Sequence, residues 1–347
     1  MINQGSFPPR ADILALLQGQ RPARVPCFSG LINVTEAGLS SLGLHLSEVH
    51  TNASKMATAT VTTHRLAGFE SASVPLDLCV EAEALGAVVD FRVDAPRPEF
   101  PRISQPVAAS SVGLDLRLPP DLTQRGRLPI VANAIRHLKE QVGQEIVVGA
   151  WVPGPLTLGL YLVDMVNLMV EVASEPEAVG KLLDVLTEAL IAVATLYHSA
   201  GADFVTVHEM GGSPGFIGPP SFKRLILPRL QRLLAAIPGP TVLSVCGNTN
   251  RAMPLIAEAG ANAISVDQLN DLARSRQTLG PNAILFGNLD PVETLANGDE
   301  AAVRGAVRQA IEAGADAIWP GCDLWPLVPL ANLRAMVDEA RRPRTRP

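Results

Sequence analysis

Cysteine is scarce in this sequence. The 347 residues contain four cysteines, Cys27, Cys79, Cys246 and Cys322. They are too few and too scattered for a disulfide framework in a chain of this length, and no two form a Cys-x-x-Cys pair. The sequence therefore predicts a reduced, cytoplasmic protein.

Basic clusters and long hydrophobic runs are also missing. The formal net charge is −6, and no basic cluster occurs before the last few residues, which argues against a nucleic-acid-binding surface. The N-terminus shows no charged segment followed by an apolar run, so we expect no secretion signal. The most apolar window, Leu156 to Val172, is interrupted by Asp164 and Asn167. We expect a buried helix there rather than a membrane span.

What the chain does contain is a regular alternation of short apolar runs and longer helical patterns. Apolar residues make up 47% of the sequence, enough for one large α/β barrel or two ordinary domains. An Ala-Gly-Ala junction begins at Ala200, at Ala259 and at Ala313, in each case between a helical pattern and an apolar run. Glycine ends a helix without a Cβ penalty, and Gly68 and Gly143 are expected to do the same.

The apolar runs predict eight strands, and the pattern predicts a single (β/α)8 TIM barrel with an N-terminal helical extension. No strand precedes a glycine-rich dinucleotide fingerprint, which disfavours a doubly wound sheet. We expect residues 1–24 to form the extension, 25–340 the barrel and 341–347 a short basic tail, with 94–127 crossing the barrel mouth. The predicted strands are 25–29, 72–78, 146–151, 204–208, 241–246, 263–266, 283–286 and 317–320.

Chemistry in such a barrel gathers where strands end, so the residues at these ends are the candidate site. They include the thiols of Cys246 and Cys322 and up to three carboxylates, which could form a zinc site with one position open for substrate. A free cysteine is more usually a small buried hydrophobe, so spacing alone leaves both interpretations open. The candidates are Asp77, Cys79, Glu209, Cys246, Asp267, Asn288 and Cys322.

Segments such as Ala263 to Asp267, Gly287 to Pro291 and Pro320 to Cys322 together resemble the uroporphyrinogen decarboxylase superfamily, and within it the zinc-dependent methylcobamide:thiol methyltransferases. The resemblance runs nearly from end to end, and it implies a single (β/α)8 barrel. Its most specific segments are Ala263 to Asp267, the Gly-Asn-Leu-Asp-Pro run from Gly287, and Pro320-Gly321-Cys322. Matches also occur at Val74-Pro75-Leu76-Asp77 and at Cys246-Gly247-Asn248-Thr249.

The resemblance separates two activities. Decarboxylases of the superfamily carry a Met-Arg-Gln-Ala-Gly-Arg motif after the first strand, whereas this chain has the uncharged segment from Cys27 to Ile32 there. Without arginines to hold acidic side chains, we expect no decarboxylation of uroporphyrinogen. Both branches keep an acid at Asp77, so that residue does not separate them.

The implied metal motif of the methyltransferases is His-x-Cys-Gly followed later by a second cysteine. Cys246 and Cys322 match the two thiolates, but Ser244 stands where the histidine is expected. We predict Glu209 as the third zinc ligand, with His208 and Asp323 as weaker candidates. A site with two thiolates and a carboxylate would have a net negative charge, which disfavours an added thiolate and suits an ether or methylated amine.

The expected function is zinc-dependent transfer of a methyl group between a corrinoid and a thiol or similar acceptor. We expect Glu209, Asp77 and Asp267 to be catalytic and Asn248 and Asn288 to contact the corrinoid. Because the chain has no Asp-x-His-x-x-Gly cobalamin motif, the methylcobamide should be carried by a separate small corrinoid protein.

The sequence leaves alternatives open. The chain could be the demethylase component that passes a substrate methyl group to Co(I) corrinoid, or a decarboxylase-like protein without decarboxylase activity, serving as a binding or scaffold protein. Its small-molecule methyl donor or acceptor is not identified by the sequence, and it could be a monomer or a homodimer. No membrane contact is expected.

Overall fold

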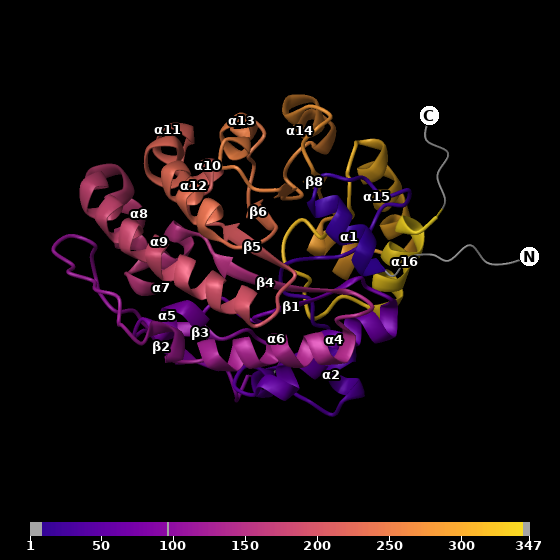
Figure 1. The fold of residues 1–347 in the computed structure, drawn as a ribbon, viewed down its shortest axis with the longest axis horizontal. Helices are drawn as coiled ribbons and strands as arrows, with labels where there is room; N and C mark the ends of the chain where they lie inside the picture. The colour runs from indigo at the N-terminus through magenta and orange to yellow at the C-terminus, as the bar shows by residue number, and fades with distance from the viewer. Residues whose placement is uncertain (1–8, 96, 343–347) are drawn as a thin grey trace, which may run out of the picture.

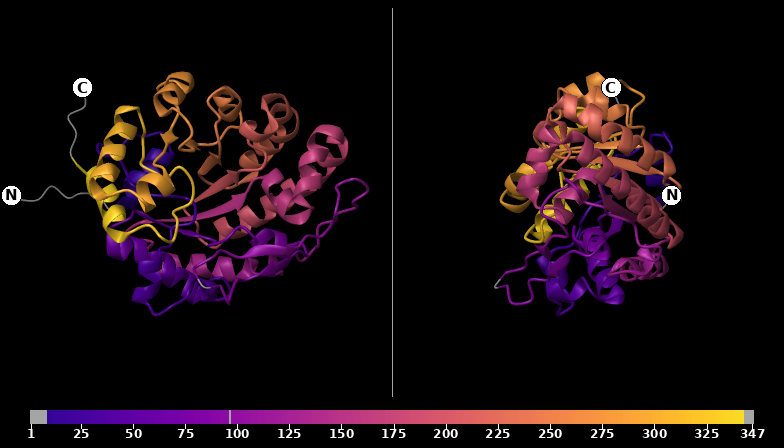
Figure 2. Two further views of the ribbon diagram at one scale, coloured as in Figure 1. Left: turned by 180° about the vertical axis from the view of Figure 1, so that it is seen from behind. Right: turned by 90° about the vertical axis from the view of Figure 1, so that its left-hand side faces the viewer.

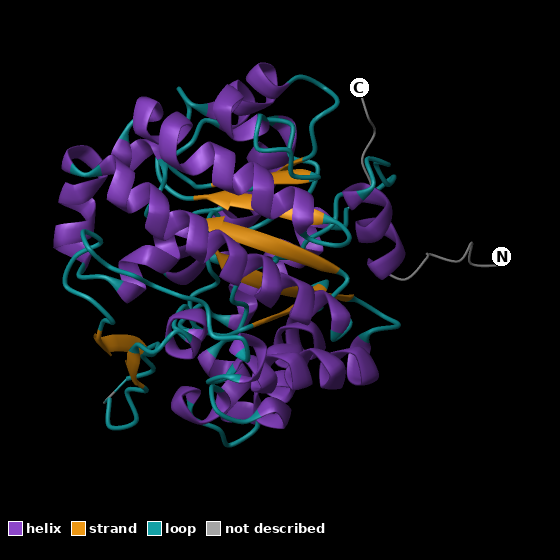
Figure 3. Ribbon diagram, turned by 60° about the vertical axis from the view of Figure 1, so that its left-hand side comes forward, coloured by secondary structure: helices purple, strands orange, loops and turns teal. Residues whose placement is uncertain are grey.

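A parallel six-stranded sheet forms the centre of the computed structural model, which describes residues 9–95 and 97–342. The strands are hydrogen-bonded in the order β1-β4-β5-β6-β7-β8, and helices lie on both sides of them (Figures 1 and 3). The strands are β1 (Ser71–Val74), β4 (Val147–Pro153), β5 (Phe204–Glu209), β6 (Thr241–Val245), β7 (Ala263–Val266) and β8 (Leu285–Phe286). Six of the eight predicted strands are therefore present in the sheet.

The other two predicted strands, 25–29 and 317–320, pair only through isolated bridges. Residue 317 bridges to Phe286 of β8, and Ile318 bridges to Cys27. The backbone N–H of Glu70, just before β1, donates to the carbonyl of Cys27. Short pairing has a simple cause, because Pro26 and Pro320 have no N–H to donate to a ladder.

The helices surround the sheet, and within the described ranges none is long and apolar enough to cross a membrane. Their bounds are α1 (Pro9–Leu17), α2 (Glu36–Ser41), α3 (Leu46–Val49), α4 (Ala53–Ala67), α5 (Val80–Ala84), α6 (Leu128–Val142), α7 (Pro155–Leu162), α8 (Met165–Ser174), α9 (Pro176–Ser199), α10 (Pro214–Ile217), α11 (Pro219–Ser221), α12 (Leu227–Ala236), α13 (Met253–Ala257), α14 (Leu272–Leu279), α15 (Glu300–Glu312) and α16 (Leu330–Ala340). A 3₁₀ turn η1 (Leu122–Gln124) and two π turns, η2 (Phe222–Ile226) and η3 (Pro291–Ala296), complete the list.

Glycines end several helices as predicted. Gly68 caps α4 with a φ of 74°, and Gly201, Gly260 and Gly314 of the three Ala-Gly-Ala junctions also have positive φ. These backbone conformations turn the chain from a helix into the next strand without a Cβ clash. Gly143 differs, because its φ of −66° is right-handed, so the prediction for that glycine was wrong.

The apolar window from Leu156 to Val172 forms two helices rather than the single buried helix that we expected. Helix α7 ends at Leu162, and Asp164 caps α8 by accepting a hydrogen bond from the N–H of Asn167. The acid that interrupts the apolar run is therefore a helix start signal. Val166 of α8 is exposed.

A separate antiparallel pair, β2 (Val88–Asp90) and β3 (Arg102–Gln105), lies in the segment that follows β1. The sequence pattern did not predict it. It stands apart from the central sheet, and the chain around it projects from the body of the protein (Figures 2 and 3).

Large aromatic residues fill the end of the sheet at which the strands begin. Phe28 makes edge contacts with Phe204, Phe286 and Trp319, at centroid distances of 5.1 to 6.0 Å. Helix α1 covers this cluster with Ile13, Leu16 and Leu17. The start of the chain thus contributes to the core at one end of the strands, and the candidate site lies at the other end.

Both chain ends extend beyond the described residues, including positions 1–8 of the predicted extension and 343–347 of the predicted tail. Arg341, the first residue of that tail, is not free in solvent. Its guanidinium donates to the Glu70 carboxylate at 3.0 Å and to the carbonyl of Gly68. Arg24 binds the same carboxylate from the N-terminal side.

Candidate metal centre

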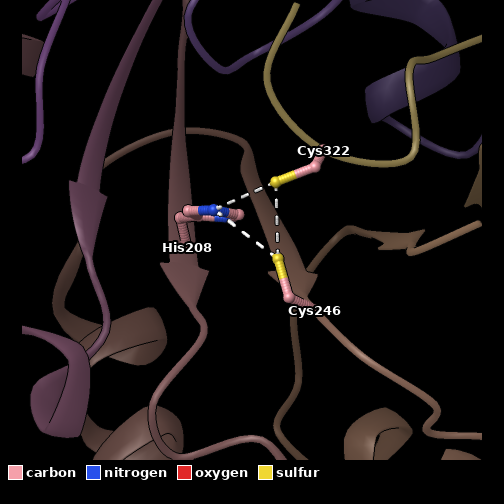
Figure 4. Close-up of side chains that lie close together, drawn as sticks. All are labelled: His208, Cys246 and Cys322. Carbon is pink, nitrogen blue, oxygen red and sulfur yellow. Dashed lines mark hydrogen bonds between the residues drawn. The ribbon is translucent and has the colours of Figure 1, made fainter. Parts of the chain in front are cut away.

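Three metal-ligating side chains converge at the carboxyl end of the sheet. His208 lies near the end of β5, Cys246 follows β6 directly, and Cys322 lies on the loop after residues 317–320. Figure 4 shows the three side chains pointing toward one another. The two sulfur atoms are 3.6 Å apart, and the Nε2 atom of His208 is 3.7 Å from the sulfur of Cys246 and 3.9 Å from that of Cys322.

Strand register explains why His208 is in this cluster. His208 pairs directly with Ser244 across the parallel β5–β6 ladder. Because side chains on neighbouring parallel strands at paired positions point to the same face, the His208 ring lies on the face that Ser244 and Cys246 share. The imidazole expected at position 244 is therefore supplied by the adjacent strand.

Several hydrogen bonds hold the loop that carries Cys246. Its N–H donates to the carbonyl of Glu209, and its carbonyl accepts a 2.5 Å hydrogen bond from the hydroxyl of Ser213. The next residue, Gly247, has a φ of 82°, and its N–H donates to Asp267 at 2.9 Å. Three hydrogen bonds thereby hold the turn directly after the strand.

Cys322 is positioned by a close approach of two backbones. A Cβ atom at Gly321 would lie 2.6 Å from the backbone nitrogen of Gln268 and 2.5 Å from its Oε1 atom, so this position requires glycine. The N–H of Gly321 donates to the carbonyl of Leu289 at 2.7 Å. These contacts bring the loop with Cys322 against the ends of β7 and β8.

The two thiols are electrostatically unequal. The hydrogen bond with Cys246 lowers the pKa of Cys322 well below its usual value against the effect of burial, and the contact with His208 lowers it further. The same hydrogen bond and burial raise the pKa of Cys246. Burial alone would lower the pKa of His208, but the contact with Cys322 raises it. Burial also raises the pKa of Asp323 to about 7. The cluster therefore already favours one thiolate.

The donor set matches a tetrahedral zinc site. With Zn–S bonds of about 2.3 Å and Zn–N bonds of about 2.0 Å, tetrahedral angles separate two sulfur ligands by about 3.8 Å and a sulfur from a nitrogen ligand by about 3.5 Å. The observed separations of 3.6, 3.7 and 3.9 Å agree with these values within 0.4 Å. Two sulfurs and one nitrogen leave a fourth tetrahedral position, as catalytic zinc sites do.

Glu209 does not join this cluster, contrary to our expectation. It follows His208 in β5, so its side chain points to the opposite face of the sheet. There its buried carboxylate accepts hydrogen bonds from the N–H groups of Leu156, Thr157 and Gly212 and from the hydroxyl of Thr157, at 2.5 to 3.1 Å. Burial raises the pKa of Glu209, and the bonds from Thr157 and Gly212 oppose that rise. Its carboxylate ties the start of α7 to the end of β5.

Asp77 is likewise engaged in a buried network. It accepts two hydrogen bonds from Arg127, lies 2.8 Å from the Nδ1 atom of His50, and accepts the N–H of Cys79. Burial alone would raise the pKa of Asp77, but His50 and Arg127 hold it below its usual range. Its described hydrogen bonds all go to these partners, so the structure gives it a role in positioning the segment after β1.

The remaining predicted site residues line the loops beside the cluster. Asp267 accepts the N–H groups of Gly247 and Leu269. Burial raises the pKa of Asp267, and these two bonds oppose the rise. Asn288 donates to the carbonyls of Asp267 and Asn270, whereas the Asn248 side chain accepts from Asn250. Asn248 and Asn288 line two different surface cavities.

Comparison with known proteins places the chain in a family. The family profile for uroporphyrinogen decarboxylase (URO-D) matches residues 8–343. The chain is 31% identical to the methylcobamide:CoM methyltransferase MtaA of Methanosarcina barkeri (strain Fusaro), over 95% of this chain and 97% of that protein. It is 26% identical to the uroporphyrinogen decarboxylase of Pelobacter propionicus, over 79% of this chain and 81% of that protein.

Among solved structures, a methyltransferase from Methanosarcina mazei superimposes with a TM-score of 0.90 at 29% identity, covering 96% of this chain and 98% of the other. The chain belongs to the uroporphyrinogen decarboxylase family.

Proposed function

We propose that this protein is a zinc-dependent methyltransferase that moves a methyl group between a methylcobamide, carried by a small corrinoid protein, and a thiol acceptor. The His208–Cys246–Cys322 cluster carries the proposal, because its donor types and separations match a catalytic zinc site. Relatives over nearly the full chain act on methylcobamide and coenzyme M by name, which supports the same substrate classes here.

The identity of the third ligand decides which acceptor the site favours. Two thiolates and a neutral imidazole together carry two negative charges, which balance the two positive charges of zinc. With Glu209 in place of His208 the site would have been net negative, and an incoming thiolate would have been repelled. A neutral site therefore favours a thiol acceptor over the ether or amine considered from the sequence.

Zinc bound here would lower the pKa of a coordinated thiol and so supply a thiolate at neutral pH. The protein's own residues hold the ligands in place. His208 offers the Nε2 lone pair only if its proton is on Nδ1, an atom that is buried and has no partner among the described residues. Ser213 and Asp267 hold the peptide group that follows Cys246, at its carbonyl and at its N–H respectively. In the net reaction a sulfur–carbon bond replaces the cobalt–carbon bond, whose electron pair remains on cobalt, and the thiol proton leaves.

We also infer that the sheet continues into a closed eight-stranded barrel over residues 25–340. The bridges from β8 to residue 317 and from Ile318 to Cys27 support this, as does the hydrogen bond from the N–H of Glu70, just before β1, to the carbonyl of Cys27. A closed barrel would place the three ligands around one mouth. A cytoplasmic location would suit this site, because a reducing compartment keeps two adjacent thiols from forming a disulfide.

Metal analysis and a spectroscopic assay test the proposal. Elemental analysis of the purified protein should find about one zinc per chain. Methylcobalamin incubated with the protein and 2-mercaptoethanesulfonate should show the change in visible spectrum that accompanies loss of the cobalt-bound methyl group. Cys246→Ala should lose both zinc and activity, whereas Cys27→Ala, a buried cysteine outside the cluster, should keep both. Metal-free protein with full activity would contradict the proposal.

A further inference from the structure

A second feature beside the metal centre is a cavity of about 380 Å³ that opens between three loops. Pro214 and Pro219 form one wall, and Asn248, Asn250 and Arg251 of the loop after Cys246 form another. Arg274, in the first turn of α14, completes it. Two arginines and two asparagines therefore line one concave space.

Neither arginine has a partner for its side chain. Within residues 9–95 and 97–342, no hydrogen bond or ion pair is formed by the guanidinium of Arg251 or Arg274. Arg276, two residues farther along α14, shows the contrast. Its guanidinium binds the carbonyls of Gly280, Ala283 and Gly314 and the carboxylate of Asp316. The cavity thus holds two arginines whose donors are unused.

Two solvent-exposed guanidinium groups give this cavity a positive potential that suits an anion. Two guanidinium groups that line one cavity repel each other. Arg274 also lies in the first turn of a helix, where the positive end of the helix dipole disfavours a cation. The carboxylate of Asp271 caps this helix by accepting the backbone N–H of Arg274, and its charge offsets part of the positive potential.

The walls of the cavity are already fixed by hydrogen bonds. The Asn250 side chain donates to Asn248 at 2.9 Å and accepts the N–H of Asp271 at 3.0 Å, which joins the loop after β6 to the start of α14. Thr249, between them, donates from its N–H and hydroxyl to Asn270. A bound group would therefore meet a preformed frame and would have to order only the two arginine side chains.

We propose that this cavity is an oxyanion-binding site for a small molecule that bears a phosphate or sulfonate group. Guanidinium groups bind such tetrahedral oxyanions through paired hydrogen bonds, and the amide NH₂ group of Asn248, which donates to no described residue, offers a further donor. The site is independent of the proposed methyl transfer. It shares a loop with Cys246, which lies two residues before Asn248.

Calorimetric titration of the zinc-loaded protein tests the proposal without measuring methyl transfer. The probes are inorganic phosphate, ethanesulfonate and cyanocobalamin, whose nucleotide loop contains a phosphodiester. Binding of ethanesulfonate would assign a sulfonate ligand, and binding of cyanocobalamin would assign a corrinoid phosphodiester. Arg251→Gln and Arg274→Gln should each weaken binding by about tenfold or more, because a charge-assisted hydrogen bond has that value, and the double variant should show no binding.

A matched control is Arg65→Gln, since Arg65 is an exposed arginine on α4 that also lacks a side-chain partner. It should bind the probes as the unaltered protein does. Zinc content and melting temperature should be unchanged in all four variants, because these side chains are exposed. Equal affinity in the double variant would overturn the proposal. So would binding of poly-glutamate but of none of the small probes, which would indicate an acidic protein surface as the partner.

Discussion

The replacement of His208 gives the sharpest test of the metal centre. His208→Ala removes one of three proposed ligands and leaves two thiolates with their mutual separation unchanged. Removing a group that only orients a ligand lowers metal affinity about 10- to 100-fold, so loss of the ligand itself should lower it by at least about 100-fold, or about 2.7 kcal/mol. Competition with a chromophoric zinc chelator measures this affinity directly.

The same loss should appear in thermodynamic stability. Zinc at about 1,000 times its dissociation constant stabilises the native protein by about 4 kcal/mol, and a site weakened 100-fold at that concentration retains only about 1.4 kcal/mol. Urea unfolding with and without zinc should show this decrease in His208→Ala. If this variant kept its zinc affinity within a few-fold, the ligand assignment would be refuted.

A rescue experiment separates ligation from packing. Because His208 and Ser244 are register partners on neighbouring strands, a histidine at position 244 should reach the same cluster. The double variant His208→Ala/Ser244→His should therefore recover most of the zinc affinity. Ser244→His alone places two imidazoles in a buried space and should destabilise the protein by about 1–3 kcal/mol. Ser244→Ala should retain zinc.

The remaining predictions concern the surrounding acids and the rejected substrate. Glu209→Gln should retain zinc but lower the free energy of unfolding by about 1.5–3 kcal/mol in urea titrations. The reason is that an amide cannot accept all the hydrogen bonds of the carboxylate. Loss of zinc in this variant would show that Glu209 reaches the metal after all. Burial raises the pKa of Glu81 to about 8, so the folded state keeps a proton that the unfolded state loses above about pH 4.5. Stability should therefore fall between about pH 4.5 and 8, and Glu81→Gln should flatten that fall; an identical pH profile in the variant would contradict this assignment. Uroporphyrinogen should not be decarboxylated, and any coproporphyrinogen detected by chromatography would count against the proposed function.

The sequence predicted most of the parallel sheet because six strands coincide with short runs rich in apolar residues. The runs at 25–29 and 317–320 look similar, but Pro26 and Pro320 restrict them to isolated bridges. The pair β2–β3 lies in a segment rich in proline and charge, where its half-exposed strands leave no clear alternation. Periodicity thus detects buried strands and misses those stabilised by local pairing.

The candidate site was predictable in part for a related reason. Cys246 and Cys322 were found because thiols at strand ends are rare and matched a spaced motif. The choice of Glu209 over His208 depended on which face of β5 each side chain occupies, and a shift of one residue reverses that face. The signal that could have decided it was the pairing of His208 with Ser244, which requires the relative register of two strands and is not contained in either strand alone.

Because the three ligands lie far apart in the sequence, a bound metal would also influence folding. His208 and Cys246 are 38 residues apart, and Cys246 and Cys322 are 76 residues apart. An ion held by all three would act as a reversible cross-link that closes two long loops, and loop closure removes conformational entropy from the unfolded chain. During synthesis, the cross-link could form only after residue 322 had left the ribosome, when nearly all of the sheet exists. Metal capture would then mark the completion of folding rather than start it.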